Sequence, residues 1–226
     1  MENEKHSIGH KDTYLSEGNE GKKSNYFIKP ERIQDMTDGV FAFAMTLLIV
    51  GIEFVDPSSK ITDGELRQNL FVMFPTFYKF ILSFFLIAVF WITHHKQFQY
   101  IKKSNDGLLW LNIFLLLFIV FIPLTTDIMD DYYYLKTGMF VFNMNILLIG
   151  LLFYAQWAYA MKHDLLDERL TEEHKRFGLQ KNSITWVVAL VAMIAGFYNT
   201  ELSGYIYLTI PLFIILLERS RKYRNL

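Results

Sequence analysis

Uncharged, mostly apolar runs alternate with short charged segments along this chain. The first run extends from Gly39 to Ile52 and is preceded by Arg32, Asp35 and Asp38. One membrane crossing takes roughly 20 helical residues, because the hydrocarbon core of a bilayer is about 30 Å thick. The pattern predicts an all-α, polytopic membrane protein with six transmembrane helices, at about 32–55, 65–103, 107–126, 137–161, 183–198 and 203–217.

The segments outside these helices are polar. Residues 1–30 contain too few apolar side chains to offset the entropy cost of ordering, so we expect a mobile N-terminal tail. A six-helix unit is expected over residues 31–220, followed by a basic C-terminus at 221–226. The second helix is longer than a bilayer is thick, which predicts that one of its ends protrudes. The polar connection 162–181 is long enough for a short surface helix.

Composition agrees with a membrane protein and excludes several kinds of site. Hydrophobic residues make up 52% of the chain and phenylalanine alone contributes 21 residues. The net charge of -1 gives no field that would attract nucleic acid, so no nucleic-acid partner is expected. The absence of cysteine excludes disulfides and thiolate metal sites. Lysine and arginine concentrate in both termini and in the 96–106 and 162–181 connections, which predicts that both termini are cytoplasmic.

The first helix has an apolar stripe. At 100° per residue, Phe43, Leu47 and Val50 lie within about 60° of one another, with Thr46 beside them. Asp38 falls about 140° away from Phe43, so it is expected to point into its own bundle. Rings of such apolar side chains around an axis would form a constriction that gates by dewetting. Ordinary lipid-facing surface has the same period, and periodicity alone favours that interpretation.

The second helix ends with Trp91, His94, His95 and Phe98. Histidines here are candidates to shuttle protons or to bond a carboxylate such as Asp38, and an aromatic cap at the headgroup level is the alternative. Adjacent histidines point about 100° apart on a helix, so they do not form a two-ligand metal site, and no metal is predicted. Polar side chains inside the spans are expected to cross-link helices, namely Asn112, Asn143 and Asn145.

Two motifs carry a family resemblance. Arg32-x-x-x-Met-Thr-Asp38, followed by Gly-Val-Phe-Ala-Phe-Ala, resembles the Arg-x-x-x-Phe-Ser-Asp signature of the transmembrane protein 175 family of potassium channels. Trp91-x-x-His94-His95-x-x-Phe98 is similar to that family's segment on the second helix. Met36 and Thr37 depart from the signature; Thr37 keeps the hydroxyl, whereas Met36 lacks the aromatic ring. The resemblance covers about residues 31–220 and indicates a prokaryotic member with one six-helix unit.

The resemblance implies a homotetrameric, potassium-permeable cation channel in the plasma membrane. It implies a pore lined by the first helices and constricted at Phe43, Leu47 and Val50, with Thr46 adjacent, in place of a carbonyl filter. No Thr-Val-Gly-Tyr-Gly sequence occurs in the chain, which is consistent with such a pore. The resemblance further implies a bracing network behind the pore helix, formed by Arg32, Thr37, Asp38, Trp91 and His94, with His95 as a further candidate.

Other functions are compatible with the same residues. A proton-conducting or proton-regulated channel would use His94 or His95 as a relay, because histidine titrates near pH 6.5. An intramembrane enzyme would use His94, His95 and Asp38 as an acid/base or metal site, although the chain lacks a suitable nucleophile and His spacing. A scaffold without transport is the third class. We expect no cofactor, no catalytic residue and no enzyme activity, with potassium as the permeant ion.

Overall fold

The computed structural model describes residues 29–52 and 60–224, and the described chain is almost entirely helical. Its elements are α1 (Pro30–Leu47), α2 (Asp63–Val72), α3 (Phe74–Phe98), α4 (Asp106–Asp131), α5 (Lys136–Lys162), α6 (Glu172–Tyr198), α7 (Thr200–Ile206) and α8 (Thr209–Arg224). The expected mobile tail lies outside the described residues, apart from its last two positions. An all-α architecture is thus confirmed for the part of the chain that is described.

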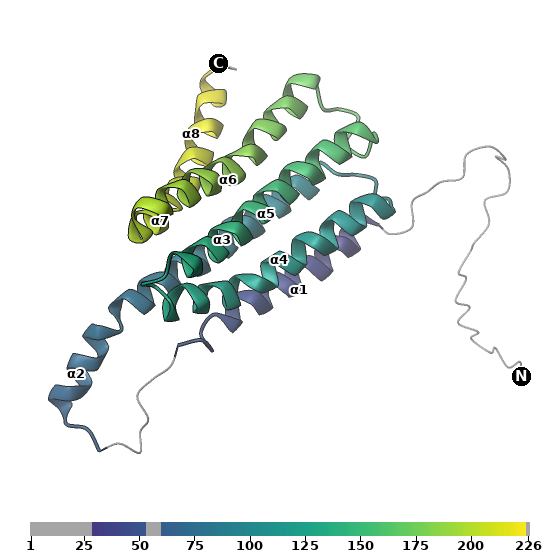
Figure 1. Ribbon diagram of the computed structural model, residues 1–226. Helices are drawn as coiled ribbons and strands as arrows, with labels where there is room; N and C mark the ends of the chain where they lie inside the picture. The colour runs from purple at the N-terminus through teal and green to yellow at the C-terminus, as the bar shows by residue number, and fades with distance from the viewer. Residues whose placement is uncertain (1–28, 53–59, 225–226) are drawn as a thin grey trace, which may run out of the picture.

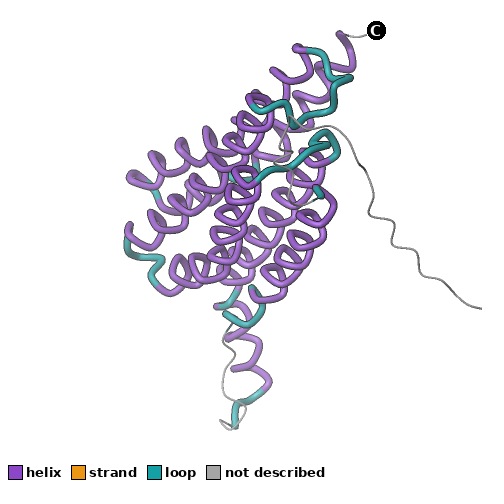
Figure 2. Tube along the Cα trace, turned by 90° about the vertical axis from the view of Figure 1, so that its right-hand side faces the viewer, coloured by secondary structure: helices purple, strands orange, loops and turns teal. Residues whose placement is uncertain are grey.

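Five long helices form the body of the molecule. Figure 1 shows α1, α3, α4, α5 and α6 side by side along a common direction, with α7 and α8 against α6. α5 is central in the packing order, because it contacts α4 on one side and α6 on the other. α1 contacts α3 and α4 at the edge of this body. α2 extends past the end of the bundle, in the views of both Figure 1 and Figure 2.

Among the described residues, four helices are long and apolar enough to cross a membrane, by length and composition: α3, α4, α5 and α6. A shorter apolar helical stretch covers Leu202–Leu217. The prediction of six spans is therefore not confirmed, although a multi-pass membrane chain is. α1 carries Glu31, Arg32, Asp35 and Asp38 within its 18 residues, which lowers its apolar character.

Several predicted helix bounds are wrong at one end. α1 stops at Leu47, so Val50 lies in a turn beyond it. The predicted helix 65–103 is two helices that meet at Met73, because Pro75 lacks the N–H that a continuous helix needs. The predicted protrusion is α2, which starts with a capping box between Thr62 and Glu65. Likewise, the predicted helix 203–217 is divided between α7 and α8.

Two other bounds differ because polar residues continue a helix. α4 continues through Pro123 to Asp131. In the turn after the proline, the Thr125 and Thr126 hydroxyls donate back to the Ile122 carbonyl. The backbone group that Pro123 leaves without its usual partner is the Ile119 carbonyl, so these hydroxyls add bonds next to the proline and do not replace the missing one. α6 begins at Glu172, well before the predicted 183, after the N-cap Thr171. The expected short surface helix is therefore the polar first part of α6 itself.

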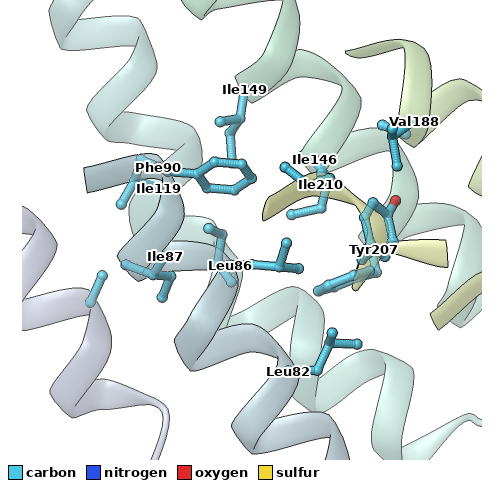
Figure 3. Close-up of a cluster of buried hydrophobic side chains, with 14 of the residues drawn as sticks. Leu82, Leu86, Ile87, Phe90, Ile119, Ile146, Ile149, Val188, Tyr207 and Ile210 are labelled. Atoms are coloured by element: carbon cyan, nitrogen blue, oxygen red, sulfur yellow. The ribbon is translucent and has the colours of Figure 1, made fainter. Parts of the chain in front are cut away.

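The main apolar core joins α3 to the later helices. Figure 3 shows Leu86 and Phe90 of α3 facing Ile146 and Ile149 of α5, with Tyr207 at one side. Phe90, Ile146 and Ile149 are fully buried. A second core cluster occupies the other end of the bundle and includes Ile33, Phe98, Leu108 and Trp157. α1 contributes to both clusters, so its buried side is fixed at both ends.

α5 and α6 approach each other closely at Gly150. A Cβ atom added there would lie 2.5 Å from the backbone nitrogen of Trp186, which is too short for any packed pair. Small residues permit this kind of backbone contact between membrane helices. The α5–α6 spacing therefore requires glycine at position 150.

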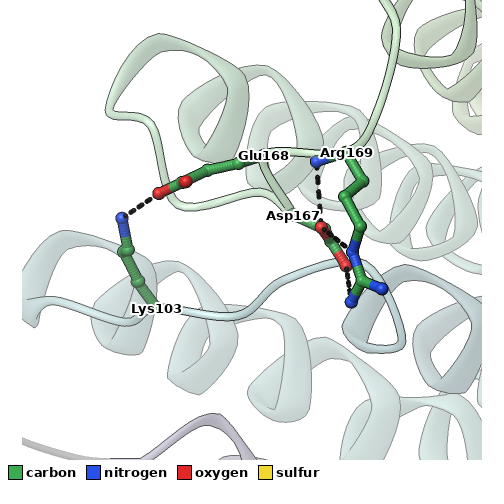
Figure 4. Close-up of polar contacts among 4 residues, drawn as sticks. All are labelled: Lys103, Asp167, Glu168 and Arg169. Atoms are coloured by element: carbon green, nitrogen blue, oxygen red, sulfur yellow. Dashed lines mark hydrogen bonds and ion pairs between the residues drawn. The ribbon is translucent and has the colours of Figure 1, made fainter.

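The connections at one end of the bundle are tied together. The backbone N–H groups of Lys102 and Lys103 donate to the Leu165 carbonyl at 2.9 and 3.1 Å, and the Asp167 N–H donates to the Tyr100 carbonyl at 2.8 Å. Figure 4 shows the adjoining side chains, with Lys103 paired to Glu168 at 3.1 Å and Asp167 paired to Arg169. These contacts hold the α3–α4 and α5–α6 connections against each other.

Candidate functional site

α1 has one buried side and one exposed side. The buried side consists of Ile33, Thr37, Phe41 and Ala44, each at most 1% exposed, at steps of three or four residues. This spacing places them on one face, which packs against α3 and α4. The rotation of α1 about its own axis is therefore set by its contacts within the chain.

The opposite side carries a row of residues that nothing in the described chain covers. Met36 is 45% exposed, Phe43 58% and Val50 74%, and Thr46 is exposed between them. We call these four residues the exposed stripe. Leu47 is half-buried, so it borders the stripe and also touches the bundle. Thr46 is tied locally, because its Oγ1 donates to the Phe43 carbonyl oxygen at 2.8 Å.

Behind α1 lies a set of polar side chains that are shielded from solvent. Asn112 of α4 is its centre: its Nδ2 donates to Thr37 Oγ1 at 3.0 Å, and its Oδ1 lies 2.8 Å from His94 Nε2. Gln156 Nε2 of α5 also donates to Asn112 Oδ1, at 3.2 Å. All four side chains are at most 1% exposed. We call Thr37, His94, Asn112 and Gln156 the buried polar network.

The hydrogen bonds of this network define a protonation pattern. Because Asn112 Oδ1 can only accept, His94 must donate from Nε2, which assigns the Nε2–H tautomer. The His94 ring is further held by stacking on Phe98, with ring centres 4.3 Å apart. The network thus connects α1, α3, α4 and α5 with fixed donor directions.

Asp38 is placed differently from the prediction. It is exposed, whereas the neighbouring Thr37 takes the position inside the bundle, so the expectation that Asp38 points into its own bundle is wrong. Its Oδ1 accepts a hydrogen bond from Trp91 Nε1 of α3 at 2.8 Å. A pair across the outer edge of the α1–α3 contact replaces the expected interior carboxylate.

The remaining predicted residues lie near this pair. His95 is exposed, and its ring centre lies 6.2 Å from that of Trp91. Arg32 is exposed at the start of α1, and in the described part of the chain its guanidinium has no hydrogen-bond or ion-pair partner. The structure therefore brings Thr37 to His94 through Asn112, and Asp38 to Trp91, as two separate contacts.

The sequence predicts Asn112 only as a helix cross-link and does not single out Gln156. The cross-link is confirmed for Asn112. It is also confirmed for Asn143, which bonds Ser203 and Tyr207, and for Asn145, which bonds the Phe118 carbonyl. Asparagine inside an apolar run was the available signal for Asn112. Gln156 sits in a similar run, and its position offered the same signal.

The arrangement does not match a metal or acid/base centre. Among residues 29–52 and 60–224, no three His, Asp or Glu side chains are grouped to hold a metal ion. Asp38 bonds an indole and His94 an amide, so these two do not form a carboxylate–histidine pair. What the geometry provides is a helix with an uncovered side, held from behind by hydrogen bonds.

Known proteins share both the sequence pattern and the fold. The family model of the endosomal/lysosomal potassium channel TMEM175 matches residues 32–123. A potassium channel of Chamaesiphon minutus is 29% identical over 148 residues, covering 64% of this chain and 72% of that protein. A potassium channel of Chryseobacterium sp. is 22% identical over 192 residues, covering 84% and 95%. The endosomal/lysosomal proton channel TMEM175 of Danio rerio is 23% identical, covering 92% of this chain and 40% of its own length.

A solved structure has the same fold. The crystal structure of a lysosomal potassium-selective channel TMEM175 homolog from Chamaesiphon minutus superposes with a TM-score of 0.70. It covers 83% of this chain and 96% of its own chain at 24% identity. At this identity the likeness establishes the fold.

Proposed function

The chain belongs to the TMEM175 family, and from this premise we propose that it is a potassium-permeable cation channel in which four copies surround a pore lined by α1. Bacterial relatives that match most of its length bear the name potassium channel, so an ion channel and not an enzyme is the function that the family supports. On the lysine and arginine distribution, both termini would be cytoplasmic. The likeness to bacterial potassium channels supports the plasma membrane as the location.

The observation that carries the proposal is the two-sided α1. Its buried side is fully used by α3 and α4, so the exposed stripe is available to other copies of the chain. Arg32 is exposed on the same side as Met36 and Phe43, about one turn before Met36. A charged group on a lipid-facing stripe would carry a desolvation cost, whereas a water-filled axis solvates it. The stripe and its charged end therefore favour a pore over a lipid contact.

The proposed constriction is apolar. Rings of Phe43, Leu47 and Val50 would exclude water from a narrow pore and gate it by dewetting. Thr46 sits between Phe43 and Val50, and its hydroxyl oxygen keeps acceptor capacity after donating to the helix backbone. Thr46 would therefore be the hydroxyl that an ion meets between two apolar rings.

The contacts behind α1 would hold these rings in place. The buried polar network fixes the middle of α1 through Thr37, and the Asp38–Trp91 hydrogen bond fixes its edge. His94 has this bracing role through Asn112 and His95 through its ring contact with Trp91. Arg32 lies on the exposed side of α1, so it would brace the helix only from a neighbouring copy. An aligned ring of side chains needs a helix whose rotation is fixed, and these bonds supply that constraint.

Flux measurements on purified protein in liposomes test the proposal. Potassium efflux should exceed sodium efflux, and Leu47→Ala and Val50→Ala should each change conductance or selectivity by about tenfold. Ile113→Ala is the matched control, because Ile113 is an exposed aliphatic residue on α4. The subunit count by native mass spectrometry should be four. Wild-type flux in both Leu47→Ala and Val50→Ala, or a monomer that conducts, would remove α1 from the pore.

Proton permeation is a second candidate. The buried polar network includes a titratable histidine, and vertebrate relatives are named proton channels. A pH-sensitive dye inside the same liposomes would report proton uptake under a pH gradient. Replacing both His94 and His95 by glutamine should abolish this uptake if they relay protons. Unchanged proton uptake in the double variant would exclude a histidine relay.

A further inference from the structure

The turn that follows α1 lies against a carboxyl group of α4. α1 and α4 lie side by side (Figure 1), and they run in parallel, because Thr37 meets Asn112 at one level and Gly51 meets Asp127 further along both segments. A Cβ atom added to Gly51 would overlap the Asp127 carboxyl oxygen Oδ1 and would lie 2.6 Å from its Cγ. The carboxyl group therefore occupies the space that the missing side chain of Gly51 leaves free.

Asp127 has no compensating partner. Its side chain is half-buried, and in the described part of the chain it makes no hydrogen bond and no ion pair. The lysine of α3 at this end of the bundle is already used: Lys79 pairs with Asp130, and its ammonium group lies 5.3 Å from the centre of the Tyr133 ring. The two side chains of that pair are only 17% and 23% exposed. Lys79 is therefore committed to Asp130 and does not neutralise Asp127.

The other groups around Asp127 are negative or neutral. Asp130 and Asp131 lie at the same end of α4, and α1 and its turn carry no charged residue from 39 to 52. Lys136, at the start of α5, is exposed and makes no ion pair with Asp127 within the described residues. The last turns of α1 and α4 contain no basic side chain, and the carbonyl groups at a helix C-terminus carry partial negative charge. An ionised Asp127 is thus repelled by its surroundings, whereas a protonated carboxyl group can donate a hydrogen bond to one of these carbonyls.

The turn beside Asp127 carries Val50 of the exposed stripe. After the last residue of α1, the Val50 N–H donates to the Leu47 carbonyl at 3.1 Å, which closes a tighter turn than an α-helix has. Leu48 anchors one side of this turn in the main core and is 3% exposed. The contact between Gly51 and Asp127 lies on the α4 side. The direction in which Val50 points therefore depends on both contacts.

We propose that Asp127 is a positioning residue for the turn that carries Val50, and that proton binding to its carboxyl group from the outer side of the membrane controls how firmly this turn is held. The protonated group donates to a carbonyl oxygen at the end of α1, and the ionised group is repelled by the same carbonyls. Acid on the outer side therefore fixes the turn, and neutral pH releases it. The consequence for ion flux rests on the proposed channel with α1 at its axis, whereas the effect on the turn does not.

Hydrogen exchange on the purified protein in detergent tests the effect on the turn. Asp127→Asn keeps the shape of the side chain, cannot ionise and can donate to a carbonyl, so it stands for the protonated state. The backbone amides of residues 47–52 should exchange at equal rates in the wild type and Asp127→Asn at about pH 4.5, and at least about threefold faster in the wild type at about pH 7.5. Comparison of the two proteins at one pH cancels the intrinsic pH dependence of exchange, since this segment has the same sequence in both.

Asp131→Asn is the matched control, because it removes one carboxylate from an exposed position at the same end of α4. It should exchange like the wild type at both pH values. Equal exchange of the wild type and Asp127→Asn at neutral pH, or the same slowing in Asp131→Asn, would overturn the proposal.

Liposome flux tests the consequence for permeation. With the inner pH held constant, wild-type potassium flux should differ at least about threefold between an outer pH of about 4.5 and one of about 7.5, and Asp127→Asn should keep the acid value at both. An exchange effect in a protein that conducts no ions would refute the channel and leave the positioning role of Asp127 in place. A conducting protein whose flux responds to outer pH equally in the wild type and Asp127→Asn would overturn the role of Asp127 in permeation.

Discussion

Asn112 Nδ2 donates a hydrogen bond of 3.0 Å to Thr37 Oγ1, across 75 residues of sequence, and so ties α4 to the buried side of α1. The same asparagine accepts bonds from His94 and Gln156. One amide therefore determines how three other helices meet at this level. Its loss would leave three buried polar groups without their partner.

We expect Thr37→Val to destabilise the protein, because it leaves the Asn112 amide N–H unpaired in the interior, a loss of about 1–3 kcal/mol. Thermal unfolding in detergent, followed by tryptophan fluorescence, measures the change. Thr46→Val is the matched control: it is the same substitution on the same helix, at an exposed position where the hydroxyl bonds only its own helix backbone. Equal loss in both variants would contradict a structural role for the buried polar network.

Variants of Phe41 and Phe43 should distinguish an effect on protein stability from an effect on ion flux. Phe41 is 1% exposed and Phe43 58%, although they are only two positions apart in the sequence. Phe41→Ala should cost about 3–5 kcal/mol of unfolding free energy, as is usual for a buried aromatic side chain. Phe43→Ala should leave the stability of the single chain within about 0.5 kcal/mol of the wild type and raise ion flux by widening the proposed constriction. Liposome flux and thermal unfolding on both variants test this pair, and a flux unaltered by Phe43→Ala would argue against a Phe43 ring.

The Asp38–Trp91 bond is expected to act on geometry more than on stability. Trp91→Phe removes the indole donor at an exposed site, so it should cost less than about 1 kcal/mol. If this bond braces the pore helix, the same variant should lower potassium selectivity. Asp38→Asn keeps an acceptor oxygen for Trp91 and should stay close to the wild type, whereas Asp38→Ala should match Trp91→Phe. Reversal potentials in planar bilayers give the selectivity, and indistinguishable values for all four proteins would rule out the brace.

Acid is expected to loosen the connection between α5 and α6. The Arg169 backbone N–H and guanidinium bond the Asp167 carboxylate and hold its pKa below the usual range (Figure 4). Since the folded pKa is the lower one, the carboxylate stabilises this connection above about pH 4, and that stabilisation is lost as pH falls through the folded value. Hydrogen-exchange protection of the Lys102 and Asp167 amides should decrease there. In Asp167→Asn the protection should no longer depend on pH in this range.

The apolar pattern predicts α4 and α5 well, because a long uninterrupted apolar run in a membrane protein is compatible with few structures other than a spanning helix. It fails at α6, where the residues between Glu172 and Lys181 are polar but include good helix formers. The N-cap Thr171 and the Lys175–Glu172 ion pair support this solvated start. Hydropathy alone cannot distinguish a polar helix from a loop. The predicted connection, 162–181, therefore includes the first residues of α6.

The site shows a similar division. Periodicity places Phe43 and Val50 on one side of α1, and both are exposed, but it cannot say which flank of the opposite side enters the bundle. Asp38 and Thr37 are adjacent, and the packing of α3 and α4 selects Thr37 for the interior. Gln156 and Asn112 are 44 residues apart in the sequence, and their contact depends on how α5 is aligned along α4. No local sequence pattern encodes that alignment.

Because the exposed stripe contributes nothing to the interior of the single chain, we expect substitutions at its four positions to leave the folding of that chain intact. Met36, Phe43, Thr46 and Val50 therefore form a natural set for a combinatorial library. Such a library could be selected for growth on limiting potassium, and the surviving sequences would report transport requirements alone.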